Sequence, residues 1–521
     1  MQWFTRRTLQ QVLLLAFAGC GGDYWLGGAR GTADRGDGAS SPTDELHDLS
    51  ADVVLSGDQN YEVGSADHGG CRIVGRGHSI RSEGSWTGHV SIRGCDVVGL
   101  GDAETEAISL ETSGQGFTTI TDSRFDQSGA IHLTSYDDST VTFRDNVILP
   151  SSRVALDPSF DASIPAFLAE GDSEKPKLFQ GNRIYRSNCW FRSPDWLIGG
   201  DSDQYSNLLI GLRAGFALEA SRLVVRGNYV HNLPFPGSGD ESTLTVIYGT
   251  TDVLAEHNVL RHGTWVVRGF GGELRYNAIL DADNAAWLEQ PFDNTKVHHN
   301  LFFMCEPPRS IDGVYAGIEL VNARTSGIEI FNNTLDGGGP KMQMLNSAVS
   351  VVDGCFLDSL RSNAIFGFPL ERNDHGEAAV RPGITEGIDP AAKRLAYADY
   401  NLFFNPDAKT ARNYALAVAN HVVRMDAGFA LHDARSGGAV DQQVDPGIMG
   451  SSADCFPYDD EDIKAGSVTV SQMLAAWRAA YAPRAGSPLV GAGDPADGRG
   501  NPIGAIGDGT QAADRFGTFG R

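Results

Sequence analysis

Charged and aromatic residues of the kinds that bind and transform polar substrates are concentrated between residues 226 and 299. Four of them share one position, two residues before a recurring asparagine: Arg226, Glu256, Arg275 and His298. If successive repeats stack, these side chains form one polar stripe, in which Arg226, Arg275 and His298 make a local cationic groove. The alternative is a solvated sheet face whose opposite charges pair between strands for roughly a few tenths of a kcal/mol each.

A second polar group lies three to six residues beyond the same asparagines, and it consists of His231, Arg261, His262, Asp281 and Asp283. Trp265, Arg268 and Trp287 are close to this group in the sequence. Aromatic faces stack on sugar rings, and an arginine can hold a carboxylate with two hydrogen bonds. We therefore expect His231, Trp265 and Trp287 on the substrate-binding side, although a single tryptophan more often belongs to a core or a bend.

Two chemistries suit these side chains. Proton abstraction beside a carboxylate needs a cation that neutralises the carboxylate and a base that accepts the proton. Arg261, His262 and Arg268 are the candidates for these catalytic roles. Glycosidic hydrolysis instead needs two or three carboxylates at a defined separation, which Asp281 and Asp283 with Glu289 or Glu256 could supply. No paired-aspartate motif supports hydrolysis, so we rank it below elimination.

Neither chemistry requires a cofactor. Asp281 and Asp283 are the candidate ligands of an optional Ca²⁺ ion, which prefers carboxylate and carbonyl oxygens. Asp201 and Asp203 form another Asp-x-Asp pair, but in a glycine-rich loop such a pair is usually a solvated turn.

An internal repeat specifies the elements that must position these residues. The repeat is aligned on a polar position occupied by Cys95, Ser123, Asn146, Asn182, Asn228, Asn258, Asn277, Asn300, Asn333, Asn363 and Asn401. The residue two places later is always apolar: Val97, Phe125, Ile148, Ile184, Val230, Leu260, Ile279, Phe302, Leu335, Ile365 and Phe403. The residue three places earlier is also always apolar, from Ile92 to Ala398.

These columns predict a solenoid in which each coil lays its strands about 4.8 Å from those of the previous coil. The apolar columns are the inward faces of two strands, and the asparagine lies at the bend between them. Stacked asparagines can satisfy backbone groups that the bend would otherwise leave buried and unpaired. We therefore assign the asparagines a structural role. Their spacing varies from 19 to 46 residues, so the longer coils carry loops or skip a register.

The pattern divides the chain into four regions. Residues 1–19 are the expected signal peptide, 20–49 a flexible tether, 50–450 the solenoid and 451–521 a C-terminal cap. The cap contains one expected helix, Val468–Tyr481, which is rich in alanine and precedes Pro483, and a glycine-rich tail. A solenoid has to protect its open end, and this helix with its tail suits that purpose.

The asparagine ladder and its repeated apolar units resemble the pectin-lyase-like superfamily of right-handed parallel β-helices over roughly residues 50–450. The resemblance implies an all-β, single-stranded right-handed parallel β-helix. Leu260-Arg261-His262-Gly263 resembles a segment of the chondroitinase B and alginate lyase family that lines the active site. Val267-Arg268-Gly269 matches the strand position of that segment better. The preceding coil has Asp240, Glu241 and Ser242 where that family places a lysine base.

The first residues predict export. Arg6 and Arg7 precede the apolar run Val12–Ala18, which is too short to span a bilayer comfortably. Phe17-Ala18-Gly19-Cys20 resembles a bacterial lipobox, which implies lipidation of Cys20 and attachment to the outer membrane or cell surface. An ordinary secretory signal, with a periplasmic or secreted product, is the alternative, and the twin arginines leave the export route open.

Six cysteines follow Cys20, and an even number in an exported chain permits disulfides. Their irregular spacing lacks the paired pattern of a zinc site, and buried free cysteines are the alternative. We favour a pair between Cys71 and Cys95.

The formal charge of −25 disfavours general attraction to nucleic acid or anionic lipid. Fold membership alone implies polysaccharide work only by analogy. Together, the motifs favour a monomeric surface protein that acts on an acidic polysaccharide, lyase-like and by β-elimination. The alternative is a non-catalytic β-helix used for glycan binding or adhesion.

Overall fold

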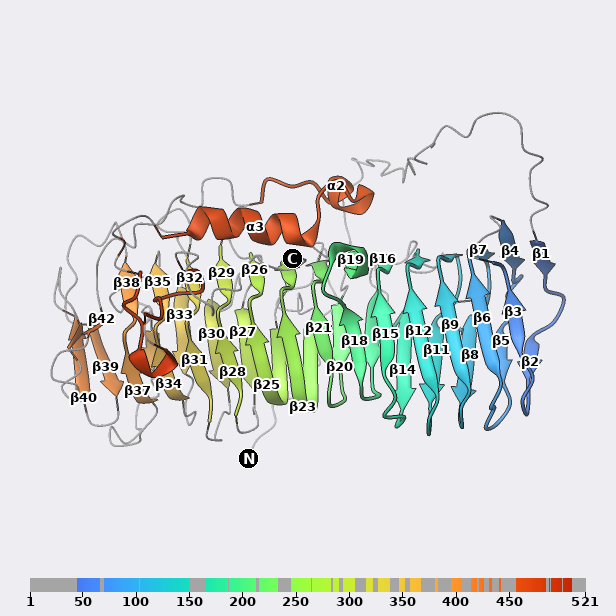
Figure 1. Cartoon of the computed structure of the whole chain (residues 1–521), viewed down its shortest axis with the longest axis horizontal. Helices are drawn as coiled ribbons and strands as arrows, with labels where there is room; N and C mark the ends of the chain where they lie inside the picture. The colour runs from blue at the N-terminus through green and yellow to red at the C-terminus, as the bar shows by residue number, and fades with distance from the viewer. Residues whose placement is uncertain are drawn as a thin grey trace, which may run out of the picture. The chain divides into compact units, whose positions relative to one another are not determined.

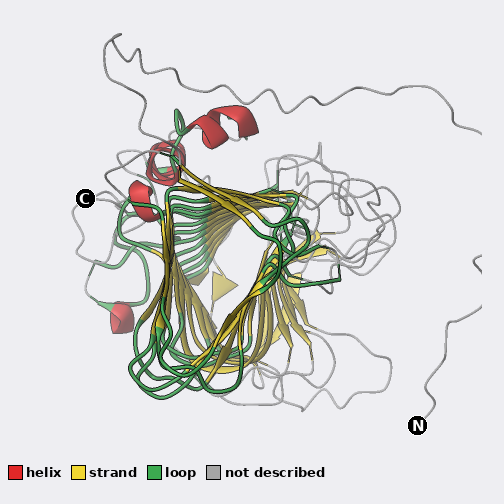
Figure 2. Cartoon of the chain, turned by 90° about the vertical axis from the view of Figure 1, so that its right-hand side faces the viewer, coloured by secondary structure: helices red, strands yellow, loops and turns green. Residues whose placement is uncertain are grey.

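The computed structural model shows a chain that winds repeatedly through three strand positions, with each coil lying on the previous one (Figure 1). The described pairs between neighbouring coils are parallel, from β1–β4 to β35–β38. The three faces enclose a triangular cross-section (Figure 2). The repeat predicts this stacking of coils, and the architecture is the right-handed parallel β-helix that the resemblance implies.

The structure describes residues 45–65, 70–102, 104–149, 165–185, 187–211, 215–232, 245–263, 265–282, 284–289, 294–304, 315–321, 327–337, 346–351, 357–366, 380–382, 395–404, 414–418, 421–425, 431–432, 440–441, 456–483, 487, 489–498 and 500–507. Side chains are not described for 245–248, 265–270, 284–285, 315–316, 346–347, 350–351, 366, 380–382, 395–399, 403–404, 414–418, 421–425, 431–432 and 440–441. Within the described helices, none is long and apolar enough to cross a bilayer.

Face A is formed by the strands that follow the bend asparagines. Its strands are β1 (Glu45–Asp48), β4 (Cys71–Val74), β7 (Cys95–Val98), β10 (Arg124–Asp126), β13 (Val147–Ile148), β16 (Arg183–Tyr185), β19 (Leu208–Gly211), β22 (Tyr229–Asn232), β24 (Val259–Arg261), β26 (Ala278–Leu280), β29 (Leu301–Phe303), β32 (Thr334–Asp336), β35 (Ala364–Phe366) and β38 (Leu402–Phe404).

Face B comes next in each coil. Its strands are β2 (Val53–Leu55), β5 (Ile80–Ser82), β8 (Ile108–Thr112), β11 (Ile131–Ser135), β14 (Phe167–Gly171), β17 (Asn188–Phe191), β20 (Gly215–Leu218), β27 (Asn284–Glu289), β30 (Tyr315–Val321), β33 (Asn346–Val351) and β36 (Val380–Pro382).

Face C completes each coil and ends at the bend. Its strands are β3 (Tyr61–Val63), β6 (His89–Arg93), β9 (Phe117–Thr121), β12 (Thr140–Arg144), β15 (Lys177–Gln180), β18 (Trp196–Gly199), β21 (Val224–Arg226), β28 (Lys296–His298), β31 (Glu329–Phe331), β34 (Leu357–Arg361) and β37 (Leu395–Asp399). The long strands β23 (Thr245–Glu256) and β25 (Trp265–Arg275) run through faces B and C without a break between them. Two antiparallel hairpins follow, β39 (Tyr414–Val418) with β40 (His421–Met425) and β41 (Leu431–His432) with β42 (Val440–Asp441).

The two predicted apolar columns face the interior. The column after the asparagine is buried from Val97 to Ile365, and the column before it is buried from Ile92 to Leu360. Leu260, for example, is 1% exposed. Phe403 and Ala398, the last members of these columns, have side chains outside the described ones.

The asparagine ladder is also confirmed. Its ten asparagines are fully buried at the bend between faces C and A: Asn146, Asn182, Asn207, Asn228, Asn258, Asn277, Asn300, Asn333, Asn363 and Asn401. Each Oδ1 accepts hydrogen bonds from the coil before it. Asn277 Oδ1, for example, accepts from the backbone N–H of Asn258 at 3.0 Å and from its Nδ2 at 2.9 Å. Ser123 and Cys95 continue the column through backbone donors.

Asn207 was missed by the sequence analysis. The spacing of 46 residues between Asn182 and Asn228 is two coils, because Asn182 donates to Asn207 and Asn207 to Asn228. The short helix η1 (Asp203–Tyr205) lies between β18 and Asn207, so Gln204 occupies the place three residues earlier where other coils have an apolar residue.

The C-terminal helix covers the outer surface of face A. The expected helix 468–481 is observed as α3 (Val470–Tyr481), which begins with a capping box between Thr469 and Gln472. Its buried residues are Val470, Met473, Leu474, Trp477 and Tyr481, which follow helical spacing. They pack on outward apolar side chains of face A, among them Tyr229 and Phe303. The helix lies beside the middle coils instead of across the open end, because face A is apolar on its outside there.

A second helix, α2 (Asp460–Ala465), precedes α3 and was not predicted. It has six residues and an acidic first turn, so it carries no helical periodicity that the sequence could reveal. The tail then includes the short helix η3 (Pro495–Asp497). The tail contacts the last bends through hydrogen bonds such as Asn332 Nδ2 to Pro502 O at 2.6 Å.

Cys71 and Cys95 form a disulfide between adjacent coils, as predicted. They are register partners in the parallel pair β4–β7. Cys189 is a buried free cysteine, and Cys20, Cys305, Cys355 and Cys455 lie outside the described residues.

Candidate functional site

The polar position two residues before the asparagine becomes a continuous row. We define the ion-pair stripe as the row Arg226, Glu256, Arg275, His298, Phe331 and Arg361, which are successive register partners on β21, β23, β25, β28, β31 and β34. The structure thus brings the four residues expected to share one face into contact range on consecutive coils.

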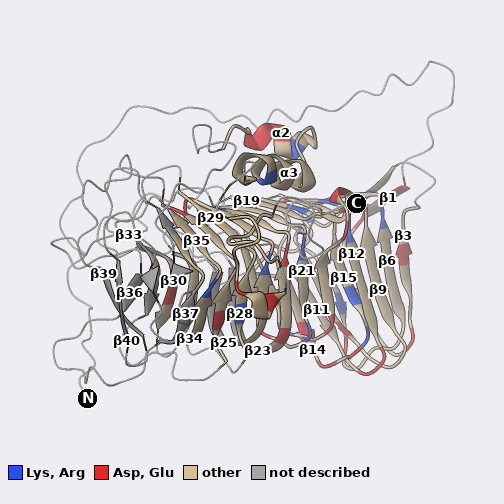
Figure 3. Cartoon of the chain, turned by 60° about the vertical axis from the view of Figure 1, so that its left-hand side comes forward, with Lys and Arg blue, Asp and Glu red and all other residues tan. Residues whose placement is uncertain are grey.

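Carboxylates neutralise the arginines of this stripe. Glu256 pairs with Arg226 on one side, and with Arg275 on the other at 2.7 Å between Nε and Oε2. Arg226 also pairs with Asp201, and Arg275 Nη1 lies 2.7 Å from Glu273. The expectation of a cationic groove is therefore wrong. Charges of both signs alternate along the strands, and Figure 3 shows acidic and basic residues interspersed there.

The two arginines still face solvent in part. The Arg226 side chain is 24% exposed and that of Arg275 is 26% exposed, whereas that of Glu256 is only 6% exposed. Arg275 uses Nε and Nη1 for its carboxylate partners. Its Nη2 has no hydrogen-bond partner within the described part of the chain, so it can donate to a ligand oxygen.

His298 is an imidazole held between an acid and an aromatic ring. Its Nε2 lies 3.7 Å from Glu273, and its ring stacks on Phe331 with centroids 4.6 Å apart. Burial lowers the pKa of His298, so the ring is neutral at neutral pH. The His298 ring and Arg275 together lower the pKa of Glu273 to about 2. The site therefore places a buried neutral imidazole, with both ring nitrogens in contact with neighbouring side chains, beside a partly exposed arginine.

An aromatic row that sequence reasoning missed lies next to the stripe, at the position directly before the asparagine. His257, Tyr276 and His299 have φ between 55° and 57°, a left-handed conformation that is uncommon for such residues. Neighbouring rings are 5.2 Å apart. His299 Nδ1 is also 2.8 Å from His298 Nδ1. The sequence signal that could have revealed this row is an aromatic residue directly before the asparagine, where other coils mostly have Gly, Asp, Asn or Ser.

Part of the second predicted cluster contacts α2 and the segment that precedes it. Asp460, in the first turn of α2, accepts from Tyr229 at 3.1 Å and contacts His231 Nδ1 at 2.8 Å. His231 Nε2 is 3.1 Å from His262 Nδ1. His262 and Asp281 are 3.9 Å apart, and each side chain is at most 4% exposed. Burial opposes ionisation of Asp460, but the contacts with His231 and Tyr229 outweigh it and lower its pKa.

Arg261 takes part in the same contact. Its guanidinium stacks on Phe456 at 4.1 Å from the ring centroid. Arg261, His262 and His231 thus connect the coils to the segment that enters α2. His231 and His262 are buried, whereas Arg261 is half-buried, so the two histidines are not exposed to a polymeric ligand.

The remaining predicted site residues are placed only in part. Arg268 and Trp265 lie on β25, where their backbones pair with β23 and β27, but their side chains lie outside the described ones. Trp287 lies on β27 in register with Val266 and Glu319 on face B, away from the stripe. Cys20 and Asp283 lie outside the described residues.

Asp281, the other expected Ca²⁺ ligand, lies beside His262. Within the described residues, the one group of three His, Cys, Asp or Glu side chains with ligand atoms within 4.8 Å of one another is Glu45, His47 and Cys71.

Face B carries a separate ion network. His132 lies between Glu106 at 3.0 Å and Glu170 at 3.1 Å, and Arg192 joins Glu170 to Glu219. The hydrogen bond to Glu106 raises the pKa of His132. Arg192 is therefore an ion-paired arginine distant from the stripe.

No protein-family model matches this sequence, and no curated protein resembles it closely enough to count as a match. Among solved structures, the chain is similar to the periplasmic alginate epimerase AlgG, with 11% identity, a TM-score of 0.29, and coverage of 59% of this chain and 75% of that one. A double mutant of that epimerase gives 11% identity, a TM-score of 0.32, and coverage of 60% and 74%. At this level the similarity concerns the β-helix fold alone.

Proposed function

We propose that this chain is an exported, polysaccharide-active β-helix protein that binds an extended glycan along the ion-pair stripe. The observation that carries the proposal is the register of Arg226, Glu256 and Arg275 on consecutive coils, followed by His298. Strand spacing of about 4.8 Å repeats these groups at intervals comparable to one sugar ring. Paired arginines and carboxylates offer both hydrogen-bond donors and acceptors, as sugar hydroxyls require.

The stripe also supports a lyase-like reaction on an acidic glycan. Arg275 Nη2 can hold a uronate carboxylate, which makes the neighbouring C–H more acidic. His298, neutral because its pKa is lowered by burial, is the proposed acceptor of that proton, and its Nδ1 has to exchange its contact with His299 Nδ1 for one with the substrate. The C–O bond to the glycosidic oxygen then breaks, that oxygen takes a proton from water, and an unsaturated sugar remains. This assignment moves the proposed catalytic pair from Arg261, which stacks on Phe456, and the buried His262 to Arg275 and His298.

Non-catalytic glycan binding or adhesion is the second candidate. It is favoured by the carboxylates that already neutralise Arg226 and Arg275, since a uronate has to compete with them. A binding protein needs no free cation for catalysis. The two functions share the stripe and differ in whether the glycan is cleaved.

Export is supported by the disulfide between Cys71 and Cys95, because such bonds persist in oxidising compartments. Lipidation of Cys20 and a monomeric state remain predictions. Ca²⁺ at Asp281 and Asp283 is likewise only a prediction, and the Arg275–His298 chemistry does not require it.

The test is to incubate the purified protein with a panel of uronate and neutral glycans, measuring binding and the ultraviolet absorbance of unsaturated products. We expect Arg275→Ala to weaken binding about tenfold, or about 1.4 kcal/mol. The matched control is Arg192→Ala, which removes an ion-paired arginine from face B. His298→Gln should abolish any absorbance growth while binding persists.

Binding without product in the unaltered protein would select the adhesion function. Equal binding by Arg275→Ala and Arg192→Ala would remove the stripe from the proposal.

A further inference from the structure

The first coil of the solenoid departs from the pattern of all later described coils. Glu45 on β1 is the register partner of Cys71, which in turn pairs with Cys95 in the ladder column. His47 is the partner of Ile73, in the column after the ladder that is otherwise apolar from Ile73 to Ile365. Two side chains that commonly bind metals therefore occupy positions on the inner side of the terminal coil.

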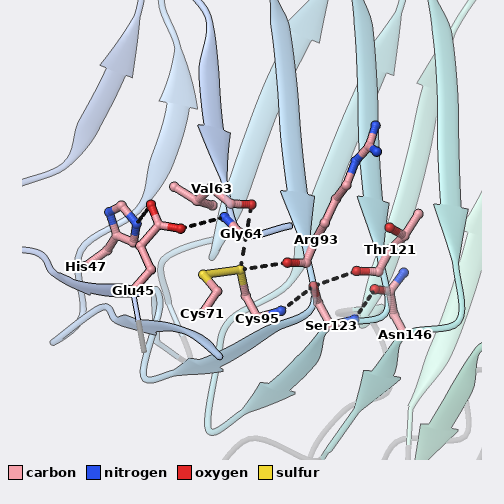
Figure 4. Close-up of a disulfide and its surroundings, with 10 residues drawn as sticks. All are labelled: Glu45, His47, Val63, Gly64, Cys71, Arg93, Cys95, Thr121, Ser123 and Asn146. Atoms are coloured by element: carbon pink, nitrogen blue, oxygen red, sulfur yellow. Dashed lines mark hydrogen bonds and ion pairs between the residues drawn. A yellow bond between two sulfur atoms is a disulfide. The ribbon is translucent and has the colours of Figure 1, made fainter. Parts of the chain in front are cut away.

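These side chains meet the disulfide. Ligand atoms of Glu45, His47 and Cys71 all lie within 4.8 Å of one another. Figure 4 shows His47 and Glu45 beside the Cys71 sulfur, which is joined to Cys95. His47 Nε2 is 2.8 Å from Glu45 Oε1, and Glu45 Oε2 accepts the N–H of Gly64 at 3.1 Å.

We propose that this terminal coil is a redox-controlled zinc site, in which Cys71, Cys95, His47 and Glu45 bind one Zn²⁺ ion when the disulfide is reduced. A dithiol supplies two electrons and two protons to the disulfide and leaves as its own disulfide. Zn²⁺ then replaces the two thiol protons, which pass to solvent. Reoxidation of the cysteines by a disulfide donor reverses the sequence and releases the ion.

The donor set explains the choice of metal. Two thiolates, one imidazole nitrogen and one carboxylate oxygen match the four-coordinate preference of zinc and its borderline softness. Ca²⁺ and Mg²⁺ need six or more oxygen ligands, which this group does not offer. Cys71 and Cys95 are both buried, whereas Glu45 and His47 are partly exposed, so an ion can enter from the His47 side.

The two states hold the end of the solenoid differently. The disulfide joins β4 to β7 only. A zinc ion would also fasten β1, an edge strand whose loss exposes the inner columns. Reduced protein would thus keep a fastened end before oxidation, when the disulfide is not yet available.

The experiment uses the whole protein, oxidised or fully reduced under anaerobic conditions, with Co²⁺ as a spectroscopic substitute for zinc. We expect the reduced protein to bind one equivalent, with thiolate-to-cobalt absorption, and Zn²⁺ to displace it. The oxidised protein should show no such absorption. Zinc should raise the thermal midpoint of the reduced protein and leave that of the oxidised protein unchanged.

Variants distinguish this site from other thiols. His47→Ala and Glu45→Gln should each weaken metal binding by about tenfold or more. His89→Ala is the matched control, because His89 pairs with Glu62 one coil away without a neighbouring thiol. Cys189→Ser should also bind normally. Unchanged cobalt spectra in Cys71→Ser with Cys95→Ser, or equal affinities for His47→Ala and His89→Ala, would overturn the proposal, whatever the glycan assays show.

Discussion

Glu273 illustrates how one carboxylate joins neighbouring coils of the ion-pair stripe. It lies on β25, contacts Arg275 on its own strand, and approaches His298 on the next coil. The register could be predicted from the sequence because Arg275 and His298 hold the same place relative to their asparagines. Glu256 stands in the same column and could be predicted, whereas Glu273 and Asp201 could not, because they lie outside the column and reach it only through their side chains.

A pH prediction follows for Glu273. The His298 ring and Arg275 hold its folded pKa at about 2, below the ordinary 4.5. In the unfolded chain the carboxyl binds its proton first as the pH falls, so its stabilisation is complete above about pH 5 and is lost towards about pH 2. Glu273→Gln should therefore reduce the dependence of unfolding free energy on pH between about 5 and 3.

The measurement is urea unfolding at neutral and acidic pH, with Glu83→Gln, which removes an exposed carboxylate, as the control. Solvent screening limits the size of the effect, since the Glu273 side chain is 34% exposed. Parallel pH curves for Glu273→Gln and the unaltered protein would contradict the assignment.

At the scale of strands and helices, apolar columns were the reliable signal. They located the strands on both sides of the bend because inward side chains stack from coil to coil. Asn207 was not predicted, because η1 separates it from β18, so no apolar residue stands three places before it. α2 escaped because it is short, and its contacts with Tyr229 and His231 join residues about 230 positions apart. The contact of His231 with Asp460 and the stacking of Arg261 on Phe456 therefore could not be predicted from local sequence.

Leu260→Asp tests the inward column. Leu260 is 1% exposed, so the substitution buries a carboxylate without a partner and should destabilise the protein by about 4 kcal/mol or more. Leu254→Asp is the control, because Leu254 lies on β23 at a half-buried outward position. Chemical unfolding should show a much larger loss for Leu260→Asp. Equal losses of unfolding free energy in the two variants would mean that Leu260 does not face the interior while Leu254 faces outwards.

The whole solenoid is stabilised by repetition, and its charge is balanced locally. The net charge of −25 would repel a polyanion at long range. Within the stripe, however, each arginine has carboxylates beside it, so local pairing and not a basic surface determines what can bind. Overall charge and fold class were accessible from the sequence. The local charge balance of the ion-pair stripe was not accessible from the sequence, because it depends on which side chains of different coils contact one another.

The ladder of asparagines has a direction. Every Oδ1 receives its donors from the coil before it, as Asn277 does from Asn258, and Asn277 Nδ2 also donates to Ala255 O in that preceding coil at 2.9 Å. Removing Asn277 therefore leaves buried groups of the preceding coil unpaired. Asn300 Oδ1, in the following coil, loses Asn277 Nδ2 as a donor but keeps the backbone N–H of residue 277.

Damage to this solenoid should consequently be greater on the N-terminal side of the substituted coil. In Asn277→Ala, amide hydrogen exchange should accelerate more around residue 258 than around residue 300, because the preceding coil loses both an acceptor and a donor. Symmetric acceleration on both sides would contradict this polarity. A substitution in one coil should therefore disturb the coil on its N-terminal side more than the coil on its C-terminal side, which keeps its register.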